Sequence, residues 1–117
     1  MPKLDLLKIT NLSLSDSKAI DILELNVEGI SSFADVIVIA TASSNRHAKS
    51  VSDKLIDQLK EKKAHIIGVE GESDSGWILV DCGNVVINIM KQEQRDFYDL
   101  EGLWGKDRSI VDTKNDY

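Results

Sequence analysis

Residues 36–40 form an unbroken apolar run, most of it β-branched, directly after Asp35. β-Branched side chains favour strands, and a strand without alternating polar positions is typical of one that is covered on both faces. The run is far shorter than the roughly 18 apolar residues that suggest a membrane-spanning helix. We therefore expect a central strand of a covered sheet in a soluble protein with no membrane contact.

An amphipathic helix is predicted directly after this strand. Ser43, Ser44 and Asn45 are residue types that cap helix N-termini. Residues that can face a core then recur at three- and four-residue spacing, namely Ala48, Val51, Ser52, Leu55, Ile56 and Leu59. The helix should run to about Lys63, and the lysines near its end complement the negative end of the helix dipole.

The remaining segments add elements on both sides of this strand and helix. We expect a short helix over 4–14, an amphipathic strand near a sheet edge over 19–27, strands over 65–69, 77–82 and 85–90, and a last helix over 96–103. Gly83-Asn84 is typical of a two-residue hairpin, so the last two strands should be antiparallel. This order predicts an α/β fold, a single domain with a mixed sheet flanked by helices.

Length and composition limit the possibilities further. The 117 residues suit one domain, and 42% apolar with 29% charged residues is typical of a globular chain. We place the domain at 1–104 and expect a flexible tail at 105–117. Cys82 is the only cysteine, which excludes an internal disulfide and disfavours a cysteine-based metal site. With no secretory signal at the N-terminus, a reducing cytoplasm fits best.

The charge balance indicates the kind of partner. The formal net charge is −6, which disfavours the phosphate contacts that dominate nucleic-acid affinity. A basic protein is the better electrostatic match, and no primary nucleic-acid contact is expected.

The predicted hairpin has two different faces. Alternation places Ile78, Val80, Ile87 and Ile89 on a purely aliphatic face that suits the core. The other face combines large apolar and hydrogen-bonding groups, as protein interfaces do, through Trp77, Leu79, Asp81, Val86, Asn88 and Met90. A helix that covers this face is an equally good interpretation of the pattern. Loss of Trp77 should open no cavity in the aliphatic core.

Two motifs resemble the ribosomal silencing factor family, also called Iojap or DUF143. Residues 77–83 follow its pattern of Trp, any residue, Leu, any, Asp, any, Gly, and 95–104 resemble its C-terminal signature of Arg, paired aromatics, Leu-Glu and Leu-Trp. Asp35, 44–47 and Glu70-Gly71 also agree, so that the resemblance covers about 19–104. The chain departs from the family at Ala42, where Gly is common, and at Asn88 and Met90, where His and Phe are common.

The resemblance implies a fold related to the nucleotidyltransferases and a regulatory, noncatalytic role without cofactor or metal. It implies binding to the large ribosomal subunit through its protein fourteen on the intersubunit face. The bound protein would block joining of the small subunit and lower translation when nutrients are short. Family members can also form homodimers or assist large-subunit maturation. The implied contact patch is Trp77, Leu79, Asp81, Asn88, Met90 and Lys91.

Two other functions stay open at this point. Residues 41–44 resemble a phosphate-cradling turn of a nucleotidyltransferase-like enzyme, but Asp81 has no second acid nearby in the sequence to hold magnesium. Cys82 is expected to be structural rather than a nucleophile, and two isolated histidines seldom bind metal. An RNA-binding ribosome maturation factor would use Arg46, His47, Lys49 and Lys62, against the negative net charge.

Overall fold

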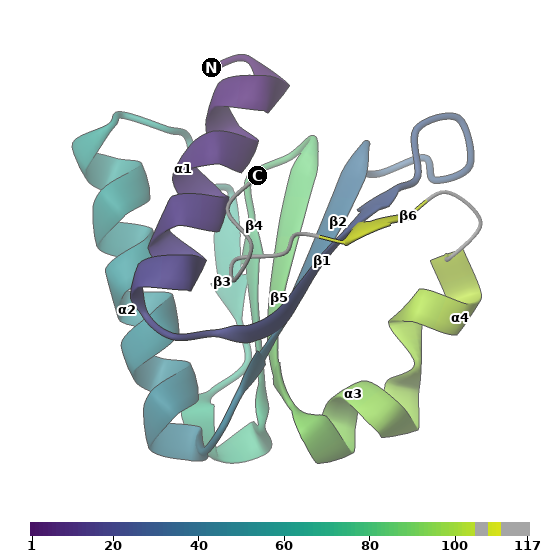
Figure 1. Ribbon diagram of the computed structural model, residues 1–117. Helices are drawn as coiled ribbons and strands as arrows, with labels where there is room; N and C mark the ends of the chain where they lie inside the picture. The colour runs from purple at the N-terminus through teal and green to yellow at the C-terminus, as the bar shows by residue number, and fades with distance from the viewer. Residues whose placement is uncertain (105–107, 111–117) are drawn as a thin grey trace.

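The computed structural model describes residues 1–104 and 108–110, and helices and groups of strands follow one another along the chain (Figure 1). The helices are α1 (Lys3–Asp16), α2 (Asn45–Glu61), α3 (Gln92–Tyr98) and α4 (Leu100–Trp104). The strands are β1 (Ile20–Asn26), β2 (Val36–Ala42), β3 (Gly68–Glu70), β4 (Trp77–Asp81), β5 (Val85–Lys91) and β6 (Arg108–Ile110), and a 3₁₀ turn spans Ser73–Ser75. None of the described helices is both long and apolar enough to cross a membrane.

The strands form one mixed sheet in the order β3-β4-β5-β2-β1-β6. β2 and β5 run parallel, and the other neighbouring strands are antiparallel, including the predicted β4–β5 hairpin. Helices α1 and α2 lie against one face of the sheet, here called the first face, and α3 and α4 lie against the second face (Figure 1). The predicted α/β domain with a mixed sheet flanked by helices is confirmed.

The first face carries the larger part of the core. All seven residues of β2 are buried, which confirms its predicted central place. The Ser44 side chain caps α2 by accepting a hydrogen bond from the backbone N–H of His47 at 3.0 Å, and the helix buries Val51, Leu55 and Leu59. The aliphatic side chains of the hairpin join the same cluster, namely Ile78, Val80, Ile87 and Ile89. The predicted assignment of the hairpin faces is therefore confirmed.

Two predicted elements differ from the structure. The strand predicted over 65–69 is confined to Gly68–Glu70, because β4 ends at Asp81, opposite Gly68, and leaves the preceding residues no strand to pair with. The last helix, predicted over 96–103, is two helices separated by Asp99, whose φ of 45° is left-handed. The Asp99 carboxylate accepts a hydrogen bond from the N–H of Gly102 at 3.1 Å and so starts a new helix.

Part of the predicted tail belongs to the sheet. Arg108–Ile110 form β6, which pairs with β1 through Leu23 opposite Ile110 and Leu25 opposite Arg108. Backbone pairing holds these three residues, where the sequence pattern alone predicted a flexible segment. The rest of that segment, 105–107 and 111–117, lies outside the described residues.

Candidate partner-binding site

The second face is only partly covered by its helices. α3 contacts β5 and β2, and α4 contacts β1, so that both helices cover the side of the sheet toward β1. A row of paired residues crosses this face from Glu70 through Leu79 and Asn88 to Ile39. Glu70 is exposed, Leu79 is partly buried, and Asn88 and Ile39 are 2% and 0% exposed. The second face is therefore covered toward β1 and open toward β4 and β3. The sequence allowed either an exposed interface or a face covered by a helix, and each of these holds for one part of the face.

Trp77 occupies the boundary between the covered and the open part. Its indole Nε1–H donates a hydrogen bond to Asn88 Oδ1 at 2.9 Å, and Asn88 Nδ2 donates in turn to the carbonyl of Val38 at 3.4 Å. The ring also packs against Tyr98 of α3, with 4.6 Å between the ring centroids. These contacts hold a large, partly exposed aromatic side chain in one orientation.

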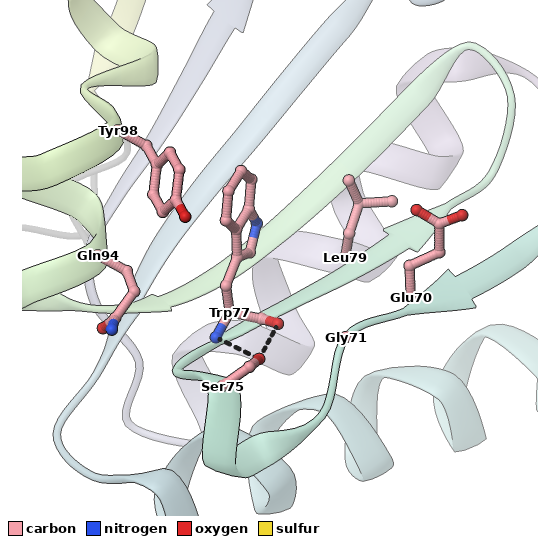
Figure 2. A pocket seen from close by; sticks show the side chains of 7 residues that line it. All are labelled: Glu70, Gly71, Ser75, Trp77, Leu79, Gln94 and Tyr98. Carbon is pink, nitrogen blue, oxygen red and sulfur yellow. Dashed lines mark hydrogen bonds between the residues drawn. The ribbon is translucent and has the colours of Figure 1, made fainter.

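A hollow of about 300 Å³ lies beside this ring. Its lining comes from β3, β4, α3 and the turn between β3 and β4, through Glu70, Gly71, Ser75, Trp77, Leu79, Gln94 and Tyr98. Figure 2 shows the indole between Tyr98 and Leu79, with the Glu70 carboxylate beyond Leu79. Gly71 has a φ of +87°, and a Cβ atom at this position would collide with the carbonyl oxygen of Trp77. A glycine is thus needed for the chain to pass this close to β4.

Arg95 fixes α3, and with it Tyr98, over the sheet. The Arg95 side chain is 8% exposed, and its NH1 group donates to the carbonyl of Asp21 at 2.7 Å and to Thr41 Oγ1 at 2.8 Å. Its Nε donates to the Glu101 carboxylate at 3.2 Å. One buried guanidinium therefore connects α3 with β1, β2 and α4.

The six residues of the predicted contact patch do not all reach the surface. Trp77 and Leu79 line the hollow together, whereas Asn88 and Met90 are 2% and 0% exposed and do not line it. In this structure the two buried side chains therefore cannot contact a partner directly. Their burial follows from the packing of α3 and α4, which strand alternation does not describe.

Asp81 and Lys91 lie apart from the hollow. Asp81 shares the second face by alternation, but its Oδ1 accepts a hydrogen bond from the N–H of Gly83 at 2.8 Å within the hairpin turn. Lys91 is opposite Ala42, which belongs to the first-face core, so alternation places Lys91 on the other side of the sheet. The patch that the family resemblance implies grouped Lys91 with Met90, although adjacent strand residues point to opposite faces.

Of the residues that line this hollow, sequence reasoning selected Trp77 and Leu79 and missed the others, among them Glu70, Gln94 and Tyr98. Glu70 could have been found from the pairing of β3 with β4, because it is opposite Leu79. Gln94 and Tyr98 belong to a helix that crosses the face, and no periodicity within a single element predicts that placement.

Comparison with known proteins decides the family. Residues 2–116 match the family described as ribosomal silencing factor during starvation. The chain belongs to the ribosomal silencing factor family. The resemblance of its two motifs is thereby confirmed, and a ribosome-associated role in translation regulation holds for the family.

Relatives of this silencing-factor chain occur in bacteria and in organelles. A ribosomal silencing factor of Chromobacterium violaceum is 40% identical over 80% of this chain and 76% of its own length. A mouse protein named mitochondrial assembly of ribosomal large subunit protein 1 is 32% identical over 78% of this chain and 41% of its own length. A crystal structure of a Chromobacterium violaceum protein superimposes with a TM-score of 0.86 at 35% identity and covers 98% of both chains.

Residues 41–44, which the enzyme alternative would use to bind phosphate, form hydrogen bonds within this silencing-factor chain. Thr41 Oγ1 is bound by Arg95, and the Ser43 N–H donates to His47 Nδ1 at 2.9 Å. His47 Nε2 donates to the carbonyl of Ser17 at 2.8 Å, which joins the end of α1 to the start of α2. Among the described residues, no three His, Cys, Asp or Glu side chains are grouped so that they could hold a metal ion.

Cys82 and Lys49, which the alternative functions would use, also interact within the protein. Cys82 is 9% exposed in the first-face core. Burial, with a smaller contribution from the negative charge of Asp81, raises the pKa of its thiol to about 11. That pKa favours the protonated thiol and fits the expected structural cysteine. Lys49, a candidate for RNA contact, pairs with Asp53 at 3.0 Å on the exposed side of α2.

Proposed function

We propose that this chain binds the large ribosomal subunit through its protein fourteen, at the intersubunit face, and blocks joining of the small subunit. Translation falls as a result when nutrients are limited. The role is noncatalytic, because binding alone keeps the two subunits apart. The name of the mouse relative speaks of large-subunit assembly, which supports the large subunit as the partner.

The observation that carries this proposal is the open part of the second face with Trp77 held at its boundary. Tryptophan is enriched among the few residues that dominate binding energies at interfaces, most of all where the side chain is fixed before binding. Trp77 is fixed by Asn88 and Tyr98, and Leu79 extends the apolar surface beside it. Asp81 contributes negative charge at the hairpin end of the same face, which suits a basic ribosomal protein.

Three further expectations belong to the same proposal. The chain acts in the cytoplasm, it can form a homodimer, and its fold is related to the nucleotidyltransferases without their activity. A fold alone does not carry an activity over, because function depends on the site.

Cosedimentation with isolated large and small subunits tests the proposal. The wild-type protein should pellet with large subunits only and should lower the yield of joined ribosomes. Trp77→Ala should weaken large-subunit binding by about thirtyfold, the effect of about 2 kcal/mol. Asp81→Lys should weaken it as well by repelling a basic partner, whereas Lys62→Ala at the end of α2 should bind as the wild type does.

Each variant is also melted, so that loss of binding can be separated from loss of folding. Sedimentation with small subunits, or full binding by a folded Trp77→Ala protein, would contradict the proposed face. Detectable nucleotide turnover with magnesium that disappears in Asp81→Asn would instead support the enzyme alternative.

A further inference from the structure

The hollow beside Trp77 has a lining with acceptors and aromatic rings but no cation. Glu70 supplies a carboxylate, Trp77 and Tyr98 supply rings, and no lysine or arginine is among its lining residues. A second hollow shares Ser75, Gln94 and Tyr98 with the first and adds Glu93 and Phe97, again without a cation. This composition disfavours phosphate and favours a positively charged occupant.

The Glu70 carboxylate is available to such an occupant. It is exposed, and no ion pair involves it in the part of the chain that the structure describes. Glu70 is the cross-strand neighbour of Leu79, and Trp77 lies two residues before Leu79 on the same face. Diagonal neighbours of this kind are about 7 to 8 Å apart, within reach of a long side chain. A side chain lying over Leu79 can therefore reach the indole ring and the carboxylate together.

Gln94 lines the α3 side of the hollow. Its Oε1 is buried and has no hydrogen-bond donor among the described residues. The oxygen lies against Gly76 and is not open to an occupant of the hollow. The recognition groups that the lining offers are thus a free carboxylate and a fixed aromatic ring.

We propose that this hollow receives an arginine side chain of the partner, with the guanidinium stacked on Trp77 and hydrogen-bonded to Glu70. Arginine fits better than lysine because its planar group stacks on aromatic rings, is weakly hydrated and binds a carboxylate through two parallel hydrogen bonds. The inference rests on the proposed function for the identity of the partner, but the recognition of a guanidinium stands on the hollow itself.

A single side chain can be tested without the ribosome. The probe is N-acetyl-arginine methylamide, titrated into the full ¹⁵N-labelled chain while the Trp77 indole N–H resonance is followed by NMR. The chain has two tryptophans, so Trp77→Phe identifies the resonance and Trp104 serves as an internal reference. We expect a saturable shift with a dissociation constant on the order of millimolar, as befits one residue. The uncharged isostere N-acetyl-citrulline methylamide should give no comparable shift.

Glu70→Gln and Glu72→Gln form a matched pair. Both remove one negative charge from an exposed side chain, but only Glu70 lines the hollow beside Trp77. We expect Glu70→Gln to abolish the indole shift and to weaken binding to large subunits by about tenfold, the effect of losing a charge-assisted hydrogen bond. Glu72→Gln should behave as the wild type does in both assays.

The two proposals fail in different ways. An indole shift that citrulline produces equally, or large-subunit binding that Glu70→Gln leaves unchanged, overturns the arginine site and leaves the silencing function standing. A wild-type chain that binds the arginine probe but no large subunits overturns the proposed function and leaves the arginine site standing. The absence of any shift with the arginine probe also overturns the site.

Discussion

Trp77 is part of the folded structure as well as of the candidate interface. Alternation alone predicts that its loss opens no cavity in the aliphatic core, and that prediction says nothing of the indole N–H. In the structure this N–H is paired with Asn88 Oδ1, and Asn88 is 2% exposed. The residue therefore contributes to stability through a buried polar group.

Trp77→Phe should lower the free energy of unfolding by about 1 to 3 kcal/mol in urea titrations, because it leaves the Asn88 carbonyl oxygen buried without a donor. Asn88→Ala in the same background serves as the control. The two changes should be coupled by at least about 0.5 kcal/mol, since the second removes the unpaired oxygen. Strictly additive effects would show that the hydrogen bond does not stabilise the fold.

The Cys82 thiol should react slowly in the folded protein. With its pKa raised to about 11 by burial and by Asp81, about one thiol in a thousand is ionised at pH 8, against about one in four for an unperturbed cysteine. Because the folded pKa is the higher one, the labelling rate of the folded protein should keep rising with pH well beyond 8.5. Labelling by a thiol reagent at pH 8 should be at least about a hundredfold slower in buffer than in urea. A folded-state rate that levels off near pH 8.5 would contradict the raised pKa.

At the scale of elements, Arg95 connects α3 and α4 to the strands of the second face. Arg95 lies on α3 and binds Asp21 of β1, Thr41 of β2 and Glu101 of α4. The register of β1 shifts between Ile20 and Leu23, and the carbonyl group that Arg95 binds lies within that shift. The buried Arg95 guanidinium thus binds a backbone carbonyl at the irregularity of β1.

Arg95→Met should lower the free energy of unfolding by about 3 kcal/mol. This is the lower end of the range for breaking a buried ion pair, because the Glu101 side chain is 24% exposed. Arg95→Lys should recover only part of this, since one ammonium cannot reach all three partners. The comparison is Lys49→Met, which breaks an exposed pair with Asp53 and should cost about 0.5 kcal/mol or less. Equal losses in chemical denaturation would show that the Arg95 contacts are no stronger than surface ones.

At the scale of the whole molecule, net charge separates a protein partner from an RNA partner. With a net charge of −6 the chain is repelled by phosphates at long range, and recognition depends on a local face. Binding to large subunits should therefore depend weakly on salt. A plot of log affinity against log salt should have a slope of magnitude below about 2, whereas six RNA contacts would give about 4 or more. A steep slope that Lys62→Ala reduces would favour RNA contact.

The sequence by itself determined the elements whose pattern is local and strong. The β-branched run of β2, the capped periodicity of α2 and the alternation of the hairpin each repeat one physical preference over several residues, so that the sheet, its first face and the side of Trp77 could be predicted. The family motifs likewise lie within short segments.

Only the tertiary structure decided how far the second face stays open. The left-handed Asp99 divides the last helix, Arg95 connects the two halves to distant strands, and β6 extends the sheet beyond β1. Each of these depends on contacts between segments far apart in the chain, and no local period encodes them. For that reason Asn88 and Met90 are buried, and Glu70 and Tyr98 join Trp77 at the surface.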